Sequence, residues 1–307
     1  MRKVYTIGDC VLDLFFENDI PFEAKPGGSF LNSSVTLGRL GINVSLISEL
    51  GVDRVGNQIK NFLLQNGVNI KHISYFSDTN SNLALAFLDE NRNADYSFYK
   101  TRKGLPTTIV FPKDVKKDDI ILFGSFLAVK KEFRSALHAF LIDCKERGAL
   151  IIYDPNFRSQ HLPMLPEVLP YIKENMALAN VVKASDEDFE LICEKKNSDQ
   201  AYQWLNEFSD AMLIYTANKQ GLSIYNHQKH SFKVPSIKPI STVGAGDTVN
   251  AAITFVFVRN GIKTSDLAEL SEEHINDLAN IATIFSQEVC MIYDNFLPVN
   301  TANKYRF

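Results

Sequence analysis

The residues most suited to chemistry lie in residues 241–252, where a glycine-rich turn leads into an apolar helical segment. Gly244, Ala245 and Gly246 carry little or no side chain, so their backbone N–H groups can face outward at the positive end of a helix dipole. Asp247 follows directly. A carboxylate beside such an anion site can accept a hydroxyl proton while the N–H groups stabilise a transferring phosphoryl group. The segment therefore predicts phosphoryl chemistry, although a plain helix start would use similar residues.

A second glycine pair precedes another helical segment near the N-terminus. Gly27 and Gly28 come before a run whose apolar positions include Val35 and Leu37. A turn followed by a Ser- or Asn-capped helix explains this pattern. The pattern also suits a binding site, because bare glycine backbone admits a ligand closely and the amide of Asn32 can donate to and accept from hydroxyl groups. The residues alone leave both interpretations open.

Two glycine patterns typical of nucleotide-binding proteins are incomplete. Gly51 and Gly56 have the spacing of a P-loop but lack the Lys and the Ser or Thr that must follow. The dinucleotide-binding pattern that begins at Gly244 has Val249 at its third glycine position. The sequence therefore favours neither a P-loop nor a dinucleotide-binding fold.

The elements that must position these residues alternate between strands and helices. Short β-rich apolar runs are separated by segments of helical periodicity. This alternation predicts an α/β fold with a mostly parallel sheet covered by helices on both faces and functional residues at the carboxyl ends of the strands. The predicted strands are residues 4–7, 44–47, 120–123, 150–153, 181–182 and 212–215, and the predicted helices include residues 30–40, 57–65, 133–147 and 186–193.

Residues 14–26 and 83–100 interrupt the alternation. In the second segment, two apolar stretches flank the turn-rich residues 89–93, which is typical of an antiparallel hairpin. A β excursion projecting from a parallel sheet suggests a lid over a pocket. No linker, low-complexity run or internal repeat divides the chain, so we expect one domain over residues 1–307 that carries this lid.

Composition and charge narrow the class of function. The net charge is −4 and the sequence has no dense Lys/Arg stripe, which argues against a nucleic-acid partner. No apolar run approaches the roughly 20 residues of a membrane span, and the N-terminus does not resemble a signal peptide. The four cysteines are far apart without a C-x-x-C motif, which argues against a zinc site or a disulfide framework. We therefore expect a cytoplasmic protein without a membrane partner.

The two glycine segments together resemble the two signatures of the PfkB (ribokinase-like) carbohydrate kinases. The first is the G-G-x-x-x-N pattern of residues 27–32, and the second is G-A-G-D at residues 244–247. Residues 51–56, 154–158 and 182–188 resemble three further family segments, in the same order. The resemblance covers essentially the whole chain. It implies a ribokinase-like three-layer α/β/α fold and a kinase that uses ATP and Mg²⁺ to phosphorylate a sugar hydroxyl.

The resemblance assigns roles to residues on the sugar side. Asp13 matches the acid after the first strand that binds sugar hydroxyls, and Asp9 is the weaker match beside it. Asp247 matches the catalytic base, and Gly244 to Gly246 match the anion hole. The implied substrate-binding residues are Asp9, Asp13, Gly27, Gly28, Asn32 and Arg158.

The resemblance also assigns residues on the nucleotide side. Asp188 matches a position linked to magnesium and phosphate. A surface salt bridge is the alternative role for Arg158, and a polar position on an amphipathic helix is the alternative for Asn280. The implied ATP-binding residues are Asn156, Lys183, Ser185, Thr216, Gly221 and Asn280.

Three positions depart from the family pattern. Ser241 replaces an Asp associated with a monovalent-cation site, so the sequence does not support potassium activation. Asp188 replaces Glu, which shortens the arm toward magnesium. Asn218 stands where glycine is usual. The nucleotide side is therefore less standard than the sugar side.

The wording of residues 154–158 and 183–187 looks most like fructokinases and 2-keto-3-deoxygluconate kinases, which favours fructose as the substrate. 2-Keto-3-deoxygluconate, ribose and a nucleoside stay open, because lid side chains decide specificity. A catalytically weak sugar- or nucleotide-binding sensor is the alternative of another class, and the presence of Asp247 opposes it. The family's habit of pairing such lids further implies a homodimer formed through the β lid.

Overall fold

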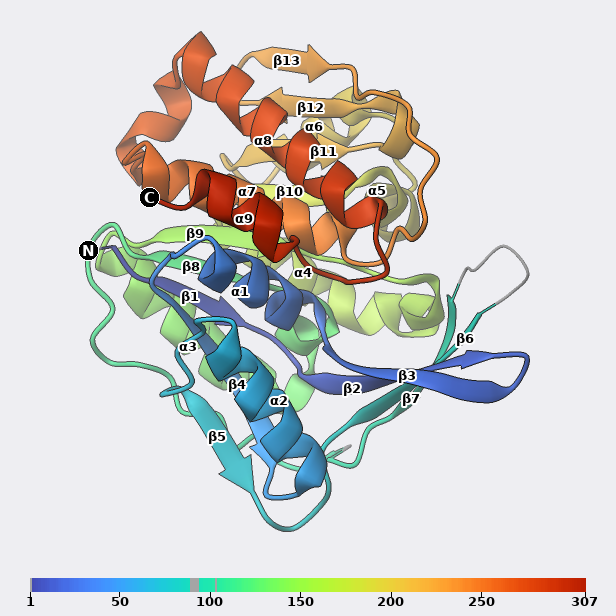
Figure 1. The fold of residues 1–307 in the computed structure, drawn as a ribbon. Coiled ribbons are helices and arrows are strands. Elements are labelled where there is room, and N and C mark those ends of the chain that lie inside the picture. Colours follow the sequence, from blue (N-terminus) through green and yellow to red (C-terminus); the bar gives the residue numbers. More distant parts are fainter. Residues whose placement is uncertain (1, 89–93, 103) are drawn as a thin grey trace.

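In the part of the chain that the computed structural model describes, residues 2–88, 94–102 and 104–307, a nine-stranded sheet forms the centre of the molecule (Figure 1). Its order is β13-β12-β11-β10-β9-β8-β1-β4-β5. Pairing is parallel from β11 to β5, and β12 and β13 add antiparallel strands at one edge. The six predicted strands are confirmed. The strands are β1 (Val4–Ile7), β4 (Val44–Gly51), β5 (Ile73–Phe76), β8 (Ile120–Gly124), β9 (Leu150–Asp154), β10 (Val181–Ser185), β11 (Met212–Thr216), β12 (Leu222–Tyr225) and β13 (Lys229–Phe232).

Helices cover both faces of this sheet, as the alternation predicts (Figure 1). Successive residues of a strand point to opposite faces, so Ile120 and Leu122 belong to one apolar core while Ile121 and Phe123 belong to the other. The first core contains side chains of α1 (Ser29–Arg39), α2 (Arg54–Gln65), α7 (Ala245–Arg259), α8 (Glu272–Cys290) and α9 (Val299–Tyr305). The second contains side chains of α3 (Lys131–Glu146), α4 (Leu165–Leu178), α5 (Asp186–Cys193) and α6 (Ser198–Asn206). The three-layer α/β/α prediction is confirmed.

A separate four-stranded sheet, in the order β3-β2-β6-β7, forms the lid and projects from one end of the large sheet (Figure 1). It consists of β2 (Val11–Glu17), β3 (Ile20–Gly27), β6 (Leu83–Leu88) and β7 (Ala94–Tyr99). The predicted antiparallel pairing of β6 with β7 is confirmed, while its predicted turn at residues 89–93 lies outside the described residues. The parallel pairing of β2 with β6 joins the two predicted lid segments into one sheet.

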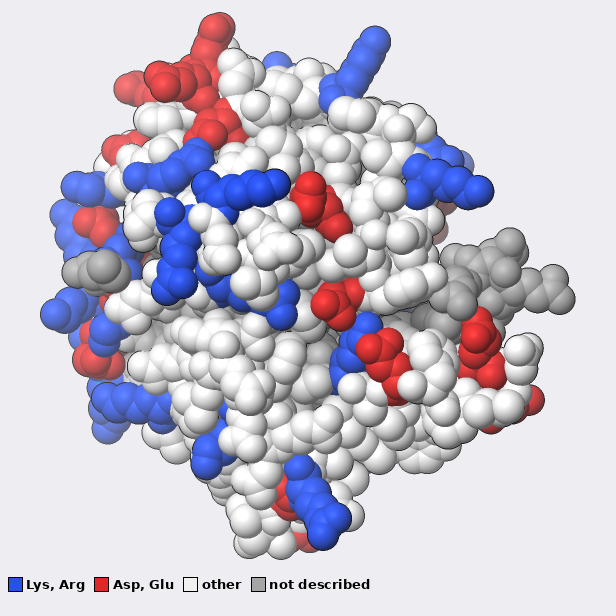
Figure 2. All heavy atoms as spheres, viewed as in Figure 1, with Lys and Arg blue, Asp and Glu red and all other residues white. Residues whose placement is uncertain are grey.

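Charged side chains are unevenly distributed over the face of the molecule shown in Figure 2. Figure 2 shows Lys and Arg side chains gathering on the side where the two chain ends lie, interspersed with Asp and Glu. Among the described residues, no helix has both the length and the apolar character needed to cross a membrane.

Candidate active site

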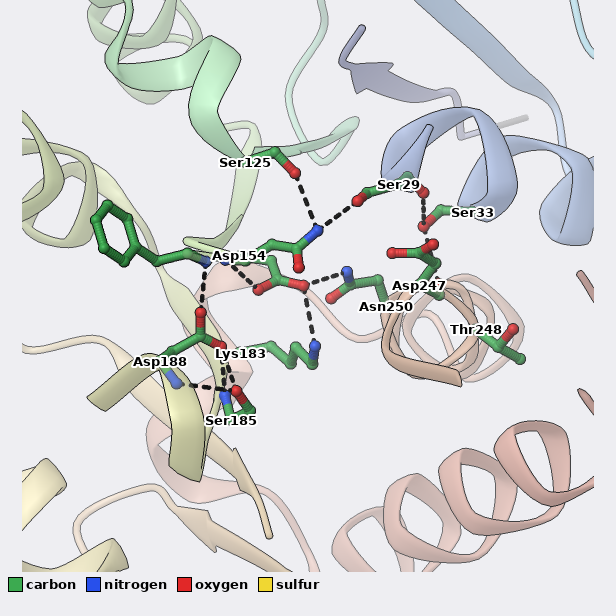
Figure 3. A network of polar contacts seen from close by, with 12 residues as sticks. Ser29, Ser33, Ser125, Asp154, Lys183, Ser185, Asp188, Asp247, Thr248 and Asn250 are labelled. Carbon is green, nitrogen blue, oxygen red and sulfur yellow. Dashed lines mark hydrogen bonds and ion pairs between the residues drawn. The ribbon is translucent and has the colours of Figure 1, made fainter. Parts of the chain in front are cut away.

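Asp247 lies in the first turn of α7, directly after the glycine-rich turn. Gly244 has a φ of 81°, and a Cβ at this position would lie 2.3 Å from the carbonyl oxygen of Asn295, so only glycine fits. Asn32 Nδ2 donates a 2.8 Å hydrogen bond to Asp247 Oδ2. Ser33 Oγ donates to the Asp247 carbonyl at 2.8 Å (Figure 3). These contacts from α1 hold the start of α7, so the two signature segments meet in space.

Two cavities meet at Asp247. The larger, of about 530 Å³, extends under the lid, and the smaller, of about 350 Å³, lies between the β10 and β11 ends and α8. Asp247 therefore belongs to the walls of both cavities. The residues shared by both cavities are Asn156, Arg158, Thr242, Gly246 and Asp247.

The larger cavity brings together most of the residues expected on the sugar side. Asp9, Asp13, Gly28, Asn32 and Arg158 all line it. Asn32 lines this cavity, and its buried Oδ1 has no hydrogen-bond partner among the described residues.

Gly27 does not line the larger cavity but lies behind Asp13. A Cβ on Gly27 would lie 1.9 Å from Asp13 Oδ2. The glycine therefore leaves room for the carboxylate, which is a packing role one step removed from a ligand.

Burial changes the acidity of Asp13 and Asp247, two of the three aspartates that line the larger cavity. Burial raises the pKa of Asp13 to about 7, and the negative charge of Asp247 adds to this shift. Burial also raises the pKa of Asp247 to about 6, although the hydrogen bond from Asn32 and the charge of Lys183 act in the opposite direction. A carboxylate with a pKa near 6 is mostly ionised at neutral pH and still basic enough to take a proton in a transition state.

Asp9 differs from these two carboxyls because it is paired with lysines. Its Oδ2 lies 3.2 Å from Lys130 Nζ and 3.8 Å from Lys100 Nζ. Burial favours the neutral acid, but the charges of Lys130 and Lys100 outweigh it and lower the pKa of Asp9. Asp9 is therefore an ionised wall residue, and Lys100 extends the lid strand β7 into the same cavity.

Behind the two cavities, Asp154 is the centre of a buried polar network (Figure 3). Its Oδ2 accepts hydrogen bonds from Lys183 Nζ at 2.9 Å and Asn250 Nδ2 at 2.7 Å, and its Oδ1 accepts one from the Asn156 backbone at 3.0 Å. Lys183 Nζ would lie 3.3 Å from a Cβ added to Gly246. It is therefore next to the glycine-rich turn of residues 244–246, which we call the anion turn. The ion pair between Asp154 and Lys183 thus places the Lys183 ammonium group beside the anion turn. Asp154 is the partner that this buried positive charge needs.

Asn156 and Arg158 follow β9 and lie where the cavities join. The side-chain amide of Asn156 donates to Ser125 Oγ at 3.1 Å and to Ser29 Oγ. Arg158 keeps a 55% exposed side chain, and its guanidinium lies 3.7 Å from Glu187. The surface ion pair with Glu187 is present. Arg158 also lies in the walls of both cavities, so it can contact a ligand there.

The smaller cavity contains Lys183, Ser185, Thr216 and Gly221 as expected, but not Asn280. Asn280 is exposed on α8, outside both cavities. Its neighbours one and two helical turns further along, Thr283 and Gln287, face the cavity instead.

The substituted positions have local structural roles. Asn218 has a φ of 47°, a left-handed conformation that Asn tolerates better than most residues, so it can replace glycine in this turn. Ser241 Oγ accepts a hydrogen bond from the backbone of Val243 at 3.2 Å and so stabilises the turn itself.

Asp188 forms a capping box with Ser185 at the start of α5. Its two oxygens accept hydrogen bonds from the backbone of Phe157 at 2.6 Å, the backbone of Ser185 at 2.8 Å and Ser185 Oγ at 2.6 Å. Burial and the charge of Asp154 raise the pKa of Asp188. No group of three or more His, Cys, Asp or Glu suited to a metal occurs among the described residues. Asp188 lines the smaller cavity, and one carboxylate together with substrate phosphates and water is a donor set that Mg²⁺ commonly uses.

Several residues of this site were not among the candidates from sequence. Asn250 lies three positions after Asp247 on α7, and this spacing places both on one helix face. Ser29, Ser33 and Ser125 gave no comparable signal, because their partners lie in distant segments. The aromatic lid residues Tyr96 and Phe98, together with Phe126, complete the larger cavity.

A carboxylate at the junction of two cavities suits transfer of a phosphoryl group onto a hydroxyl, and the molecule is a phosphotransferase of this kind. Comparison with known proteins agrees. Residues 1–283 match the family described as pfkB family carbohydrate kinase. The chain is 29% identical to probable fructokinase-5 of Arabidopsis thaliana, over 82% of this chain and 79% of that protein. It is 26% identical to the fructokinase of Escherichia coli, over 86% and 87% of the two chains.

Solved structures show the same fold. Aminoimidazole riboside kinase from Salmonella enterica, complexed with aminoimidazole riboside and an ATP analogue, superimposes with a TM-score of 0.82 at 21% identity, over 99% of each chain. The chain belongs to the pfkB carbohydrate kinase family.

Proposed function

We propose that this protein is an ATP-dependent fructose kinase. The observation that carries the proposal is the position of Asp247 in the wall shared by the two cavities. Fructose is preferred because curated relatives over most of the chain are named fructokinase. The larger cavity, of about 530 Å³, has ample room for a hexose.

In the proposed reaction, the sugar lies under the lid with one hydroxyl directed at Asp247. Asp13 and Asn32 bind other hydroxyls, and Asp247 accepts the proton as the oxygen attacks the γ-phosphorus. The bond from the γ-phosphorus to the bridging oxygen of ADP breaks, and the N–H groups of Gly244 and Gly246 stabilise the transferring group. The N–H group of Ala245 already donates to the Thr242 carbonyl at 3.3 Å.

The ATP is proposed to occupy the smaller cavity. Thr216, Gly221 and Thr283 line its far part, while Lys183 lies near the anion turn. Mg²⁺ would supply charge neutralisation at the β- and γ-phosphates, and Asp188 is the residue we propose to hold it. Asn280 is exposed in this conformation, so we propose that Thr283 and Gln287 are the residues of α8 that contact the adenine of ATP.

An ATP-consumption assay over a panel of fructose, ribose, 2-keto-3-deoxygluconate and nucleosides tests the proposal. We expect the highest kcat/KM with fructose, and no sugar-dependent consumption by Asp247→Asn. A higher value with another acceptor would replace fructose and keep the kinase. ATP consumption that no acceptor stimulates would contradict the kinase and favour a sensor.

We also propose a cytoplasmic location and a homodimer paired through the lid. Cys10, Cys144, Cys193 and Cys290 are all free thiols, which supports a reducing compartment. Exposed apolar side chains on the lid support the dimer.

A further inference from the structure

Lys25 is a buried lysine on the inner face of the lid, and the proposed reaction does not use it. It is 9% exposed and lies on β3 directly opposite Asp13 of β2. Opposite residues of an antiparallel pair project from the same face of a sheet. The face that directs Asp13 toward the sugar cavity therefore also presents Lys25.

The ammonium group of Lys25 reaches across to the loop that follows α8. Its Nζ donates to the carbonyl of Tyr293 at 3.2 Å and lies 3.3 Å from Asp294 Oδ1. On its own strand, it lies 3.0 Å from Glu23 Oε2. The Asp294 side chain is 47% exposed, so solvent screens its ion pair with Lys25. The hydrogen bond to the Tyr293 carbonyl orients the Lys25 ammonium group toward the backbone of this loop.

Residues 290–295 comprise the last residue of α8 and the segment after it, and we call them the bracing loop. One end of the bracing loop contacts the residues just before the anion turn, and the other end contacts the anion turn itself. The carbonyl of Cys290 accepts hydrogen bonds from the backbones of Ile240 at 2.8 Å and Ser241 at 3.3 Å. At the other end, the backbone of Asn295 packs so closely on Gly244 that no side chain fits between them. Asn295 is itself buried and lines the sugar cavity. A shift of the bracing loop would therefore move the amides that stabilise the phosphoryl group.

We infer that Lys25 is a positioning residue that couples the sugar lid to the anion turn through the bracing loop. When a sugar fixes the lid, Lys25 fixes residues 293 and 294, and these hold the backbone against Gly244. Sugar binding should then favour nucleotide binding, because both ligands stabilise one arrangement of the loop. This inference rests on the proposed function for the identity of the two ligands, but not on turnover.

The test measures Kd for a non-hydrolysable ATP analogue with and without saturating sugar. The sugar is fructose, or another acceptor from the panel if the enzyme phosphorylates that one instead. In the wild type we expect the sugar to tighten analogue binding by about fivefold or more. In Lys25→Met this factor should fall below about twofold, and kcat should fall about tenfold with the sugar KM changed less than about threefold. Lys25→Arg, which keeps the charge, should recover part of both effects.

Glu23→Gln is the matched control, because it removes a carboxylate that contacts the same ammonium without contacting the bracing loop. It should keep the wild-type coupling factor. Asp294→Asn removes the partner on the loop side and should reduce the factor, which covers the case in which Lys25→Met does not fold. An unchanged factor in Lys25→Met, or no coupling in the wild type, would overturn the inference. A wild type that binds both ligands with coupling but transfers no phosphoryl group would instead overturn the proposed function alone.

Discussion

Asn32 Nδ2 donates a 2.8 Å hydrogen bond to Asp247 Oδ2, across 215 positions of sequence. A residue expected to bind sugar thus also orients the expected base. The side-chain oxygen of Asn32 is buried without a partner among the described residues, and we expect it to accept a hydrogen bond from a hydroxyl of the bound sugar. We therefore expect sugar recognition and base orientation to be linked at this residue.

For Asn32→Ala, we expect two separable effects. The sugar KM should rise by about tenfold, because a ground-state contact to a hydroxyl is lost. The acid limb of the kcat/KM profile should also move to higher pH, because the hydrogen bond from Asn32 lowers the pKa of Asp247. Steady-state kinetics from pH 5 to 9 measure both. A raised KM with an unmoved acid limb would separate Asn32 from the base.

The wild-type pH profile should show that Asp247 works in its ionised form. Burial raises its pKa to about 6, so the carboxylate is increasingly protonated below that value and the base is lost. Asp13, with a pKa raised to about 7 and an electrostatic interaction with Asp247, titrates in the same range, so the limb belongs to the pair. We expect kcat/KM to fall as pH decreases from 7 to 5. A flat profile down to pH 5 would exclude a base with this environment.

Replacement of Asp247 by Asn should remove chemistry while keeping binding. We expect kcat to fall by about 10²- to 10⁴-fold, because general base catalysis contributes on that scale. Calorimetric affinities for the sugar and for an ATP analogue should stay within about threefold, since the amide keeps the size of the carboxylate. Turnover at the wild-type rate would remove Asp247 as the base.

Asp13→Asn should weaken sugar binding but stabilise the free enzyme. The folded-state pKa of Asp13 is raised from 3.8 to about 7, so the native state binds more protons than the unfolded state between these values. The wild type therefore loses stability as pH rises from 4 to 7, because a buried carboxyl must ionise. The neutral Asn avoids this cost. The variant should melt at a higher temperature than wild type at pH 8, with little difference at pH 4, and its sugar KM should rise. An equal Tm difference at both pH values would show that ionisation is not the cause.

The main sheet and its covering helices could be predicted from sequence because each strand and helix has its own periodicity. The runs at residues 120–123 and 150–153 are apolar at every position, as burial on both faces requires. Helix α4 is harder to recognise from sequence, since Pro170 lies inside it. Local patterns therefore identified the scaffold best where no helix-breaking residue intervened.

The site could be predicted only as far as its motifs extend. The glycine turns and Asp247 are visible because their chemistry needs adjacent residues. The exposure of Asn280 and the inward position of Thr283 depend on the rotation of α8 against α7, which the sequence alone does not specify. The contact of Lys25 with the bracing loop likewise joins segments 268 positions apart. Such contacts depend on tertiary packing and leave no local signal.

The lid should form a dimer interface. β3 and β7 end the four-stranded order, and edge strands with apolar side chains favour pairing with another chain. Ile20, Phe22 and Tyr99 are 66%, 51% and 57% exposed in the isolated chain, and pairing would remove this surface from water. Analytical ultracentrifugation at micromolar concentration should therefore give about twice the chain mass of 34.6 kDa.

Ile20→Lys combined with Phe22→Lys should shift the protein to monomer, because a second chain would have to bury the new charges. Phe307→Lys is the matched control: this residue is 68% exposed at the chain end, on the side of the molecule away from the lid (Figure 1), and should leave the dimer intact. A fully active wild-type monomer at these concentrations would contradict the proposal.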